Sequence, residues 1–141
     1  CLEDLITAGT EGVQLLLHPP AALTSLRGAK QWLRPVQRLT RCFGPRMHLV
    51  MAPRYDGQDP ARFAAIAGLA TRLGLPTLAS ATPLMHHGRW RKLADVLAAI
   101  RLGVRVDTLG RAALANSEQR LRSATEMCRL YQDHPATLQR A

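Results

Sequence analysis

The sequence predicts an α/β fold in which short buried strands alternate with longer amphipathic helices. Short apolar runs recur along the first 103 residues, and each run is followed by a stretch with helical periodicity. These pairs repeat about every thirty residues, a rhythm typical of strand–helix units. We therefore expect a parallel sheet or barrel of about three such units with the helices outside it. The length of 141 residues suits one domain with a real core.

The first predicted unit is a strand over residues 12–18 and a helix over residues 28–43. The strand is a continuous apolar run that ends at Pro19-Pro20. The helix carries one apolar stripe, formed by Trp32, Val36, Leu39 and Phe43. Because Pro35 falls inside this pattern, the helix either begins near it or is kinked there.

The second predicted unit is a strand over residues 47–52 and a helix opened by Asp59-Pro60. We expect Asp59 to cap the free backbone N–H groups, and proline suits the first helical position. Gly74 is the candidate residue for the end of this helix. The predicted core-facing residues of the helix are Phe63, Ile66, Ala67, Ala70 and Leu73.

The third predicted unit is a strand over residues 77–81 and a helix over residues 89–102. The apolar positions of this helix are Leu93, Val96, Leu97 and Ile100. Residues 104–122 show no strong period and are expected to form a loop with fragments of structure. Ser123 and Glu126 then have the spacing of a capping box, which predicts a short helix up to about residue 132.

The charge of the chain is strongly positive and unevenly distributed. The formal net charge is +9, and no acidic residue lies between Glu11 and Asp56. In this stretch four cations recur at helical spacing: Lys30, Arg34, Arg38 and Arg41. They are candidates for contacts with nucleic-acid phosphates, because a surface of one sign attracts polyanions. The alternative is a solvated helix face on a basic protein.

Several other site classes have no support in the sequence. Three cysteines lie far apart without CxxC spacing, which argues against a disulfide framework or a zinc cluster and fits the cytoplasm. Cys42 and Cys128 are interpreted as packing residues. No apolar run approaches the roughly 20 residues needed to span a bilayer, so we expect no membrane contact. Nucleotide-binding glycine loops, nucleophile elbows and paired carboxylates are not found either.

The histidines offer one possible metal site. His18 and His86-His87 lie where predicted strands end, and ligands bind at the carboxyl ends of parallel strands. His48 falls within the second predicted strand. Adjacent histidines on a strand point to opposite sides, and no carboxylate accompanies them at ligand spacing. We therefore expect loop histidines rather than a metal centre.

Residues 74–86 (GLPTLASATPLMH) and 93–103 (LADVLAAIRLG) resemble the later part of the PHP domain of bacterial C-family DNA polymerases, in the error-prone branch. Residues 120–136 are similar to the stretch that leads such polymerases towards the palm and thumb. The resemblance implies that residues 1–103 are the C-terminal part of a PHP-like domain and that residues 104–141 are a linker. A whole PHP domain is a distorted barrel of βα units, so the chain would hold part of one.

The resemblance also implies which metal ligands are missing. PHP domains of this family carry Asp-x-His on the third of these strands, and the matching positions are Thr82 and Leu84. The acidic ligand of the preceding strand corresponds to Met51 or Ala52. These side chains cannot replace carboxylate and imidazole donors, so we expect no metal, cofactor or catalytic residue in this stretch. The palm aspartates that hold magnesium would lie downstream.

The function implied is part of an error-prone, translesion DNA-directed DNA polymerase, a nucleotidyltransferase acting in DNA damage-induced mutagenesis. Its partners would be DNA and other subunits of a mutagenesis complex, and this stretch would be a structural module near DNA. A part of a barrel is expected to associate or to depend on the rest of the polypeptide. The alternatives are a free-standing PHP-type metal-dependent phosphoesterase that uses His18, His86 and His87, and a basic adaptor.

Overall fold

The computed structural model describes residues 2–7, 11–20 and 26–141. Within these ranges three strands form one parallel sheet in the order β1-β2-β3, which confirms the predicted α/β class and the parallel pairing. The strands are β1 (Leu15–Leu17), β2 (Met47–Met51) and β3 (Thr77–Ala79). Leu16 lies opposite His48, and Val50 lies opposite Leu78. Closure of the sheet into a barrel stays a prediction.

The helices agree with the predicted periodicity and add two that the sequence did not predict, α1 and α6. Helix α2 begins at Leu26 and runs through Pro35, so of the two alternatives at that proline a helix start is excluded, whereas a kink stays a prediction. Short 3₁₀ turns are η1 (Gly44–Arg46), η2 (Gly88–Trp90), η3 (Val106–Thr108) and η4 (Gly110–Ala112). The α-helices are α1 (Leu2–Thr7), α2 (Leu26–Phe43), α3 (Asp59–Leu73), α4 (Arg91–Leu102), α5 (Ala124–Leu130) and α6 (Pro135–Leu138).

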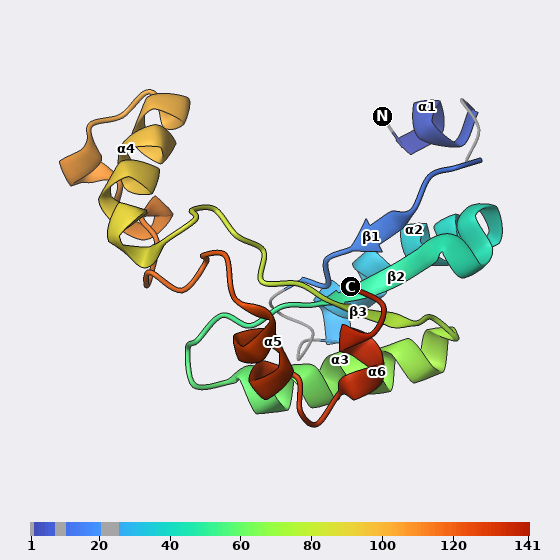
Figure 1. Cartoon of the computed structure of the whole chain (residues 1–141). Coiled ribbons are helices and arrows are strands. Elements are labelled where there is room, and N and C mark those ends of the chain that lie inside the picture. The colour runs from blue at the N-terminus through green and yellow to red at the C-terminus, as the bar shows by residue number, and fades with distance from the viewer. Residues whose placement is uncertain (1, 8–10, 21–25) are drawn as a thin grey trace.

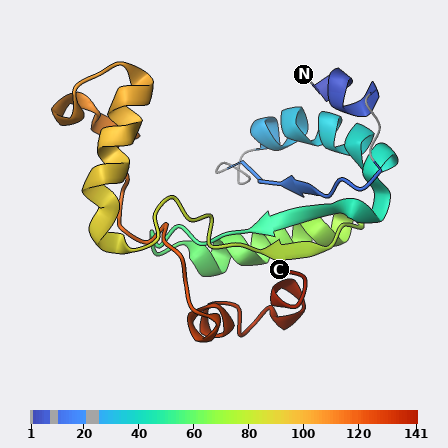
Figure 2. The ribbon, with the colours of Figure 1, turned by 45° about the horizontal axis from the view of Figure 1, so that its top comes forward.

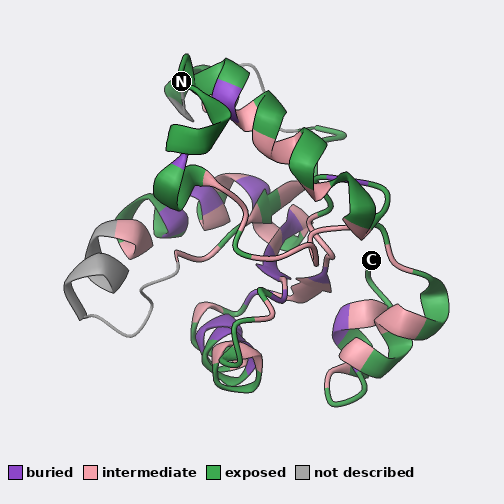
Figure 3. Cartoon of the chain, turned by 90° about the vertical axis from the view of Figure 1, so that its left-hand side faces the viewer, coloured by how far each residue is buried: buried purple, intermediate pink, exposed green. Residues whose placement is uncertain are grey.

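The core lies between the sheet and the helices α2 and α3. Met47, Leu49 and Met51 of β2 are fully buried, because alternate side chains of a strand point to the same face. They pack against the predicted stripes of the two helices, of which Val36, Leu39, Phe43, Phe63 and Ile66 are buried. In Figure 3 the buried positions, drawn in purple, lie mainly in the sheet and in the helix segments that cover it. Both stripes were therefore predicted correctly.

Helices α5 and α6 return to the sheet beside β3 (Figures 1 and 2). Tyr131, directly after α5, is 1% exposed, and its ring stacks on Phe63 with ring centroids 5.4 Å apart. The hydroxyl groups of Thr137 and Thr77 are 2.5 Å apart and join α6 to β3. The segment after residue 103 therefore contributes to the same core, and the boundary at that residue stays a prediction.

Helix α4 stands away from the sheet, at the upper left of Figure 1, together with η2, η3 and η4. It ends at the predicted residue but begins two residues later than predicted, after η2. Its apolar side chains do not pack on the sheet: Leu93, Val96, Leu97 and Ile100 are between 40% and 70% exposed. The physical reason is that no fourth strand follows α4 in the described ranges, so no sheet surface lies beside it. We call residues 86–118 the arm.

The arm joins the rest of the molecule through a narrow neck. The backbone N–H groups of Leu84 and Met85 both donate to the carbonyl oxygen of Gln119, and Leu121 N–H donates to Met85. A side chain at Gly88 would approach the Cβ and carbonyl oxygen of Ser117 to 3.2 Å, so glycine permits the two segments to lie this close. Both connections of the arm therefore run side by side.

No helix in the described ranges is both long enough and apolar enough to cross a membrane. Of the two cysteines interpreted as packing residues, Cys42 packs partly buried against the core. Cys128 is exposed on α5, so that interpretation was wrong for this residue.

Candidate functional site

A cavity of about 510 Å³ opens at the carboxyl ends of the strands, where parallel folds place their ligands. Residues that follow each of the three strands reach it, and α3 and the segment returning from the arm form its walls. The residues lining it include His18, Pro19, Ala52, Pro53, Arg54, Arg62, Ile66, Thr82, Leu84, Asn116 and Gln119.

The positions expected from the resemblance to match metal ligands of PHP domains lie at this cavity. Thr82 and Leu84 both line it, as does Ala52, whereas Met51 is fully buried in the core. Thr82 has a φ of 42°, in the left-handed region that a β-branched residue rarely adopts. Aspartate and asparagine tolerate this conformation better, because their short polar side chains can hydrogen-bond locally.

The histidines of the phosphoesterase alternative are not brought together. His18 lines the cavity, but Nε2 of His86 accepts a hydrogen bond from Trp90, and Nδ1 of His87 accepts one from the backbone of Arg89. In residues 2–7, 11–20 and 26–141 no three histidine, cysteine or carboxylate side chains gather as a metal-binding group. That alternative therefore gains no support from the geometry.

The polar groups on the α3 side of the cavity are paired. Arg62 forms ion pairs with Asp56 and Asp59, and its hydrogen bond holds the pKa of Asp56 below its ordinary value. Asp59 does not cap α3 as predicted, because the helix begins at this residue and Gln58 occupies the N-cap position. Its carboxylate instead accepts hydrogen bonds from the backbone N–H groups of Arg54 and Tyr55, which closes the loop before the helix.

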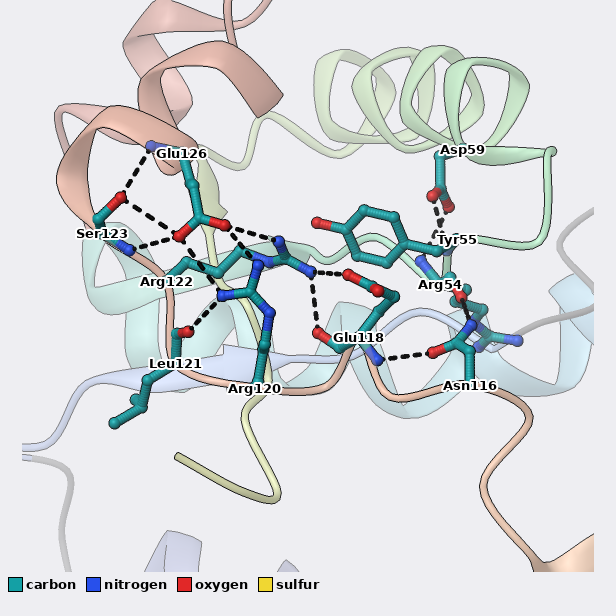
Figure 4. A network of polar contacts seen from close by, with 10 residues as sticks. All are labelled: Arg54, Tyr55, Asp59, Asn116, Glu118, Arg120, Leu121, Arg122, Ser123 and Glu126. Carbon is teal, nitrogen blue, oxygen red and sulfur yellow. Dashed lines mark hydrogen bonds and ion pairs between the residues drawn. The ribbon is translucent and has the colours of Figure 1, made fainter. Parts of the chain in front are cut away.

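A polar network fixes the segment that returns from the arm (Figure 4). The Arg122 guanidinium, 7% exposed, lies 4.5 Å from the centroid of the Tyr55 ring and forms ion pairs with Glu118 and Glu126. Asn116 donates a side-chain hydrogen bond to the carbonyl oxygen of Arg54. These contacts hold one wall of the cavity against the loop that follows β2.

The capping box predicted for Ser123 and Glu126 is confirmed. The serine hydroxyl accepts from the Glu126 backbone, and the glutamate carboxylate accepts from the Ser123 backbone. Arg120 adds an ion pair at 2.5 Å. This hydrogen bond and the one from Ser123 lower the pKa of Glu126 to about 2.

A second candidate site is the exposed basic side of α2. Arg34, Arg38 and Arg41 are all exposed, whereas the side chain of Lys30 lies outside the described part of the chain. Arg38 is held by Glu3 of α1 through two hydrogen bonds of 2.5 and 2.7 Å, so its charge is partly neutralised.

One further cation joins this side from another helix. Arg41 and Arg72 line the same shallow cavity between α2 and α3, which brings the last turn of α3 beside the predicted contacts. Sequence reasoning missed Arg72, because nothing in the local pattern says which side of α3 packs beside α2. We call Arg34, Arg38, Arg41 and Arg72 the α2 basic surface.

The chain is similar to segments of proteins named error-prone DNA polymerase. It is 43% identical over 139 residues to the one from Ruegeria pomeroyi, 39% over 114 residues to the one from Sinorhizobium medicae, and 33% over 130 residues to the one from Rhodopseudomonas palustris. These matches cover 99%, 80% and 92% of the chain but only 12%, 10% and 11% of the relatives, so the chain spans about a tenth of their length. No family model matches the chain.

Proposed function

We propose that this chain is a structural module of an error-prone DNA polymerase that acts in the cytoplasm during DNA damage-induced mutagenesis. The observation that carries the proposal is the similarity along 99% of the chain to a protein with that name. The whole polypeptide would add deoxynucleotides past template lesions with magnesium in a palm domain outside these residues. Other subunits of a mutagenesis complex would assist it.

In this proposal the module is a degenerate, metal-free PHP domain. The cavity at the carboxyl ends of the strands corresponds to the former metal site, and Thr82 and Leu84 occupy its ligand positions. The left-handed backbone at Thr82 supports this interpretation, because it suits the aspartate of the family pattern better than a threonine. A threonine hydroxyl and a leucine side chain offer no strong ligand for zinc or manganese.

The role proposed for the α2 basic surface is contact with DNA phosphates without reading of bases. Arginine suits this role, because its planar guanidinium pairs with phosphate through two hydrogen bonds. Arg34, Arg41 and Arg72 extend from two adjacent helices, so they can follow a phosphate backbone rather than a single group. Affinity from such contacts falls steeply with salt and depends little on sequence.

The test is binding of the 141-residue chain to primed DNA over a series of salt concentrations. Log affinity falls linearly with log salt concentration. Removal of one arginine–phosphate pair is expected to make this decline less steep by about 0.9 for duplex DNA. We expect this decrease in Arg34→Gln and Arg41→Gln. Arg111→Gln, an exposed arginine on the arm, is the matched control and should leave the slope unchanged. Binding that is equal at low and high salt contradicts the proposal.

Elemental analysis of the purified chain separates the proposal from the phosphoesterase alternative. A metal-free module should retain no zinc, manganese or iron after dialysis. About one tightly bound ion per chain, the stoichiometry of a single structural or catalytic site, contradicts the metal-free module and favours the enzyme.

A further inference from the structure

An apolar groove runs along the exposed side of α4. A cavity of about 330 Å³ is lined by Leu84, Met85, His86, Trp90, Leu93, Ala94 and Leu97. Trp90, Leu93 and Leu97 are 39%, 48% and 58% exposed, and Ile100, 70% exposed, extends the stripe by one turn. Contiguous apolar surface of this kind marks an interaction site more often than free surface.

The charges around the groove are positive. Helical geometry at 100° per residue places Lys92 on one side of the apolar stripe and Arg101 on the other, and both are exposed. The acidic residue of α4, Asp95, lies on the opposite side of the helix. There its carboxylate accepts a hydrogen bond from the Leu114 backbone and faces Arg91. The exposed apolar stripe formed by Leu93, Val96, Leu97 and Ile100 therefore has a cation on each side, with Arg101 on the side of the groove and Lys92 on the other side.

This charge pattern argues against a second copy of the chain as the occupant. Two α4 helices packed through the stripe would bring Lys92 and Arg101 against the same cations of the other copy. No carboxylate of α4 faces the stripe to relieve that repulsion, and the chain as a whole carries a net charge of +9. An occupant with carboxylates beside its apolar side chains would instead form ion pairs with Lys92 and Arg101.

We propose that the α4 groove binds an acidic amphipathic segment of the same polymerase polypeptide, outside these 141 residues. The inference rests on the proposed function, because the relatives named error-prone DNA polymerase are about eight times as long as the chain. A segment tethered in the same polypeptide reaches an effective concentration in the millimolar range, well above that of a separate partner. An amphipathic helix in an apolar groove is a common form of such docking.

Zero-length cross-linking with a carbodiimide in the full-length polypeptide tests the occupant directly. The reagent joins an amine to a carboxylate in contact with it, and Lys92 is one of only two lysines in these 141 residues. We expect a cross-link from Lys92 to an aspartate or glutamate elsewhere in the same polypeptide. Lys92→Arg keeps the charge and should remove that cross-link. A cross-link between copies in an isotope-mixed sample, or none at Lys92, overturns the proposal.

Limited trypsin digestion tests whether the groove is covered. In the full-length polypeptide we expect cleavage after Arg101 to become at least tenfold faster in Leu97→Asp than in the native protein. Leu121→Asp should leave the rate unchanged, because Leu121 has nearly the same exposure (57% against 58%) but lies outside the groove. Equal cleavage rates in Leu97→Asp and the native polypeptide overturn the proposal. Primer extension by the full-length polypeptide is measured separately, so loss of the polymerase assignment is distinguishable from loss of the docking.

Discussion

The Tyr131 hydroxyl donates a hydrogen bond of 2.5 Å to the carbonyl oxygen of Met51, 80 residues earlier in the chain. The same hydroxyl accepts from the backbone N–H of Ser80 at 3.3 Å. Tyr131 thereby joins the ends of β2 and β3 to the segment between α5 and α6.

Replacement of Tyr131 by phenylalanine should lower the free energy of unfolding by about 0.5–1.5 kcal/mol, because the buried Met51 carbonyl oxygen loses one of its two donors and keeps only the backbone N–H of Ser80. Urea unfolding followed by circular dichroism measures the loss. Tyr55→Phe is the matched control and should change stability by less than about 0.5 kcal/mol, since it keeps the ring under Arg122. Equal losses in both variants would show that the hydrogen bond to Met51 makes no measurable contribution to the free energy of unfolding.

Stability should also fall at alkaline pH through Tyr131. Burial raises its pKa to about 12, from an ordinary value near 10 for an unfolded chain. A raised pKa means that the contribution is complete below pH 10 and is lost as the pH rises towards 12, by about 2–3 kcal/mol at most. Unfolding measured between pH 9 and 11 should show a steeper decline in the native chain than in Tyr131→Phe. Parallel curves exclude this assignment.

The capping box should make α5 sensitive to acid. The pKa of Glu126 is lowered to about 2, so its stabilising effect is complete above pH 4.5 and is lost as the pH falls towards 2. Glu126→Gln should flatten the stability curve in that interval. Ser123→Ala should cost about 1 kcal/mol at neutral pH, the usual effect of losing an N-cap. An unchanged acid dependence in Glu126→Gln contradicts this prediction.

Removal of Glu3 should strengthen binding to DNA. Its carboxylate forms an ion pair with the guanidinium of Arg38. Glu3→Gln removes this ion pair and leaves one more cation of the α2 basic surface available to phosphate. We expect tighter binding to primed DNA at low salt, with the advantage shrinking as salt rises. Glu11→Gln removes the same charge from the loop before β1 and controls for net charge. An equal gain in the two variants would mean that only net charge matters.

On the proposed PHP interpretation, a carboxylate and an imidazole introduced at positions 82 and 84 should give the chain affinity for a metal ion. Thr82→Asp with Leu84→His places a carboxylate and an imidazole at the cavity that His18 also lines. We expect zinc to bind this double variant at least tenfold more tightly than the native chain, measured by calorimetry. Thr82→Asn with Leu84→Gln has a similar shape without the stronger ligands and should not gain affinity. The absence of any gain in the double variant contradicts the assignment of these positions.

Local features were predicted well because the residues that determine them lie close together in the sequence. The capping box at Ser123 needs only the glutamate three residues later, and the stripes of α2 and α3 depend on helical spacing alone. Other features depend on how distant segments pack, and the local sequence does not reveal that packing. Examples are the stack of Tyr131 on Phe63 and the position of Arg41 and Arg72 at the same cavity.

Helix α4 also shows that local spacing predicts a helix but not its tertiary packing. Its apolar spacing predicts a buried stripe, and the stripe exists, but Leu97 and Ile100 are exposed. Periodicity indicates that a face needs a partner without indicating whether the same chain supplies it. Asp59 was misassigned for a related reason: a carboxylate at a helix start can serve the helix or the loop before it, and the turn geometry decides.

The arm joins the rest of the molecule at the neck, at Met85 and Leu121. Its outgoing and returning segments are hydrogen-bonded to each other, so we expect them to move together. Arg122 follows the neck directly and forms ion pairs with Glu118 and Glu126. A molecule that binds α4 and tilts the arm is therefore expected to move the residues from the arm that line the cavity at the carboxyl ends of the strands.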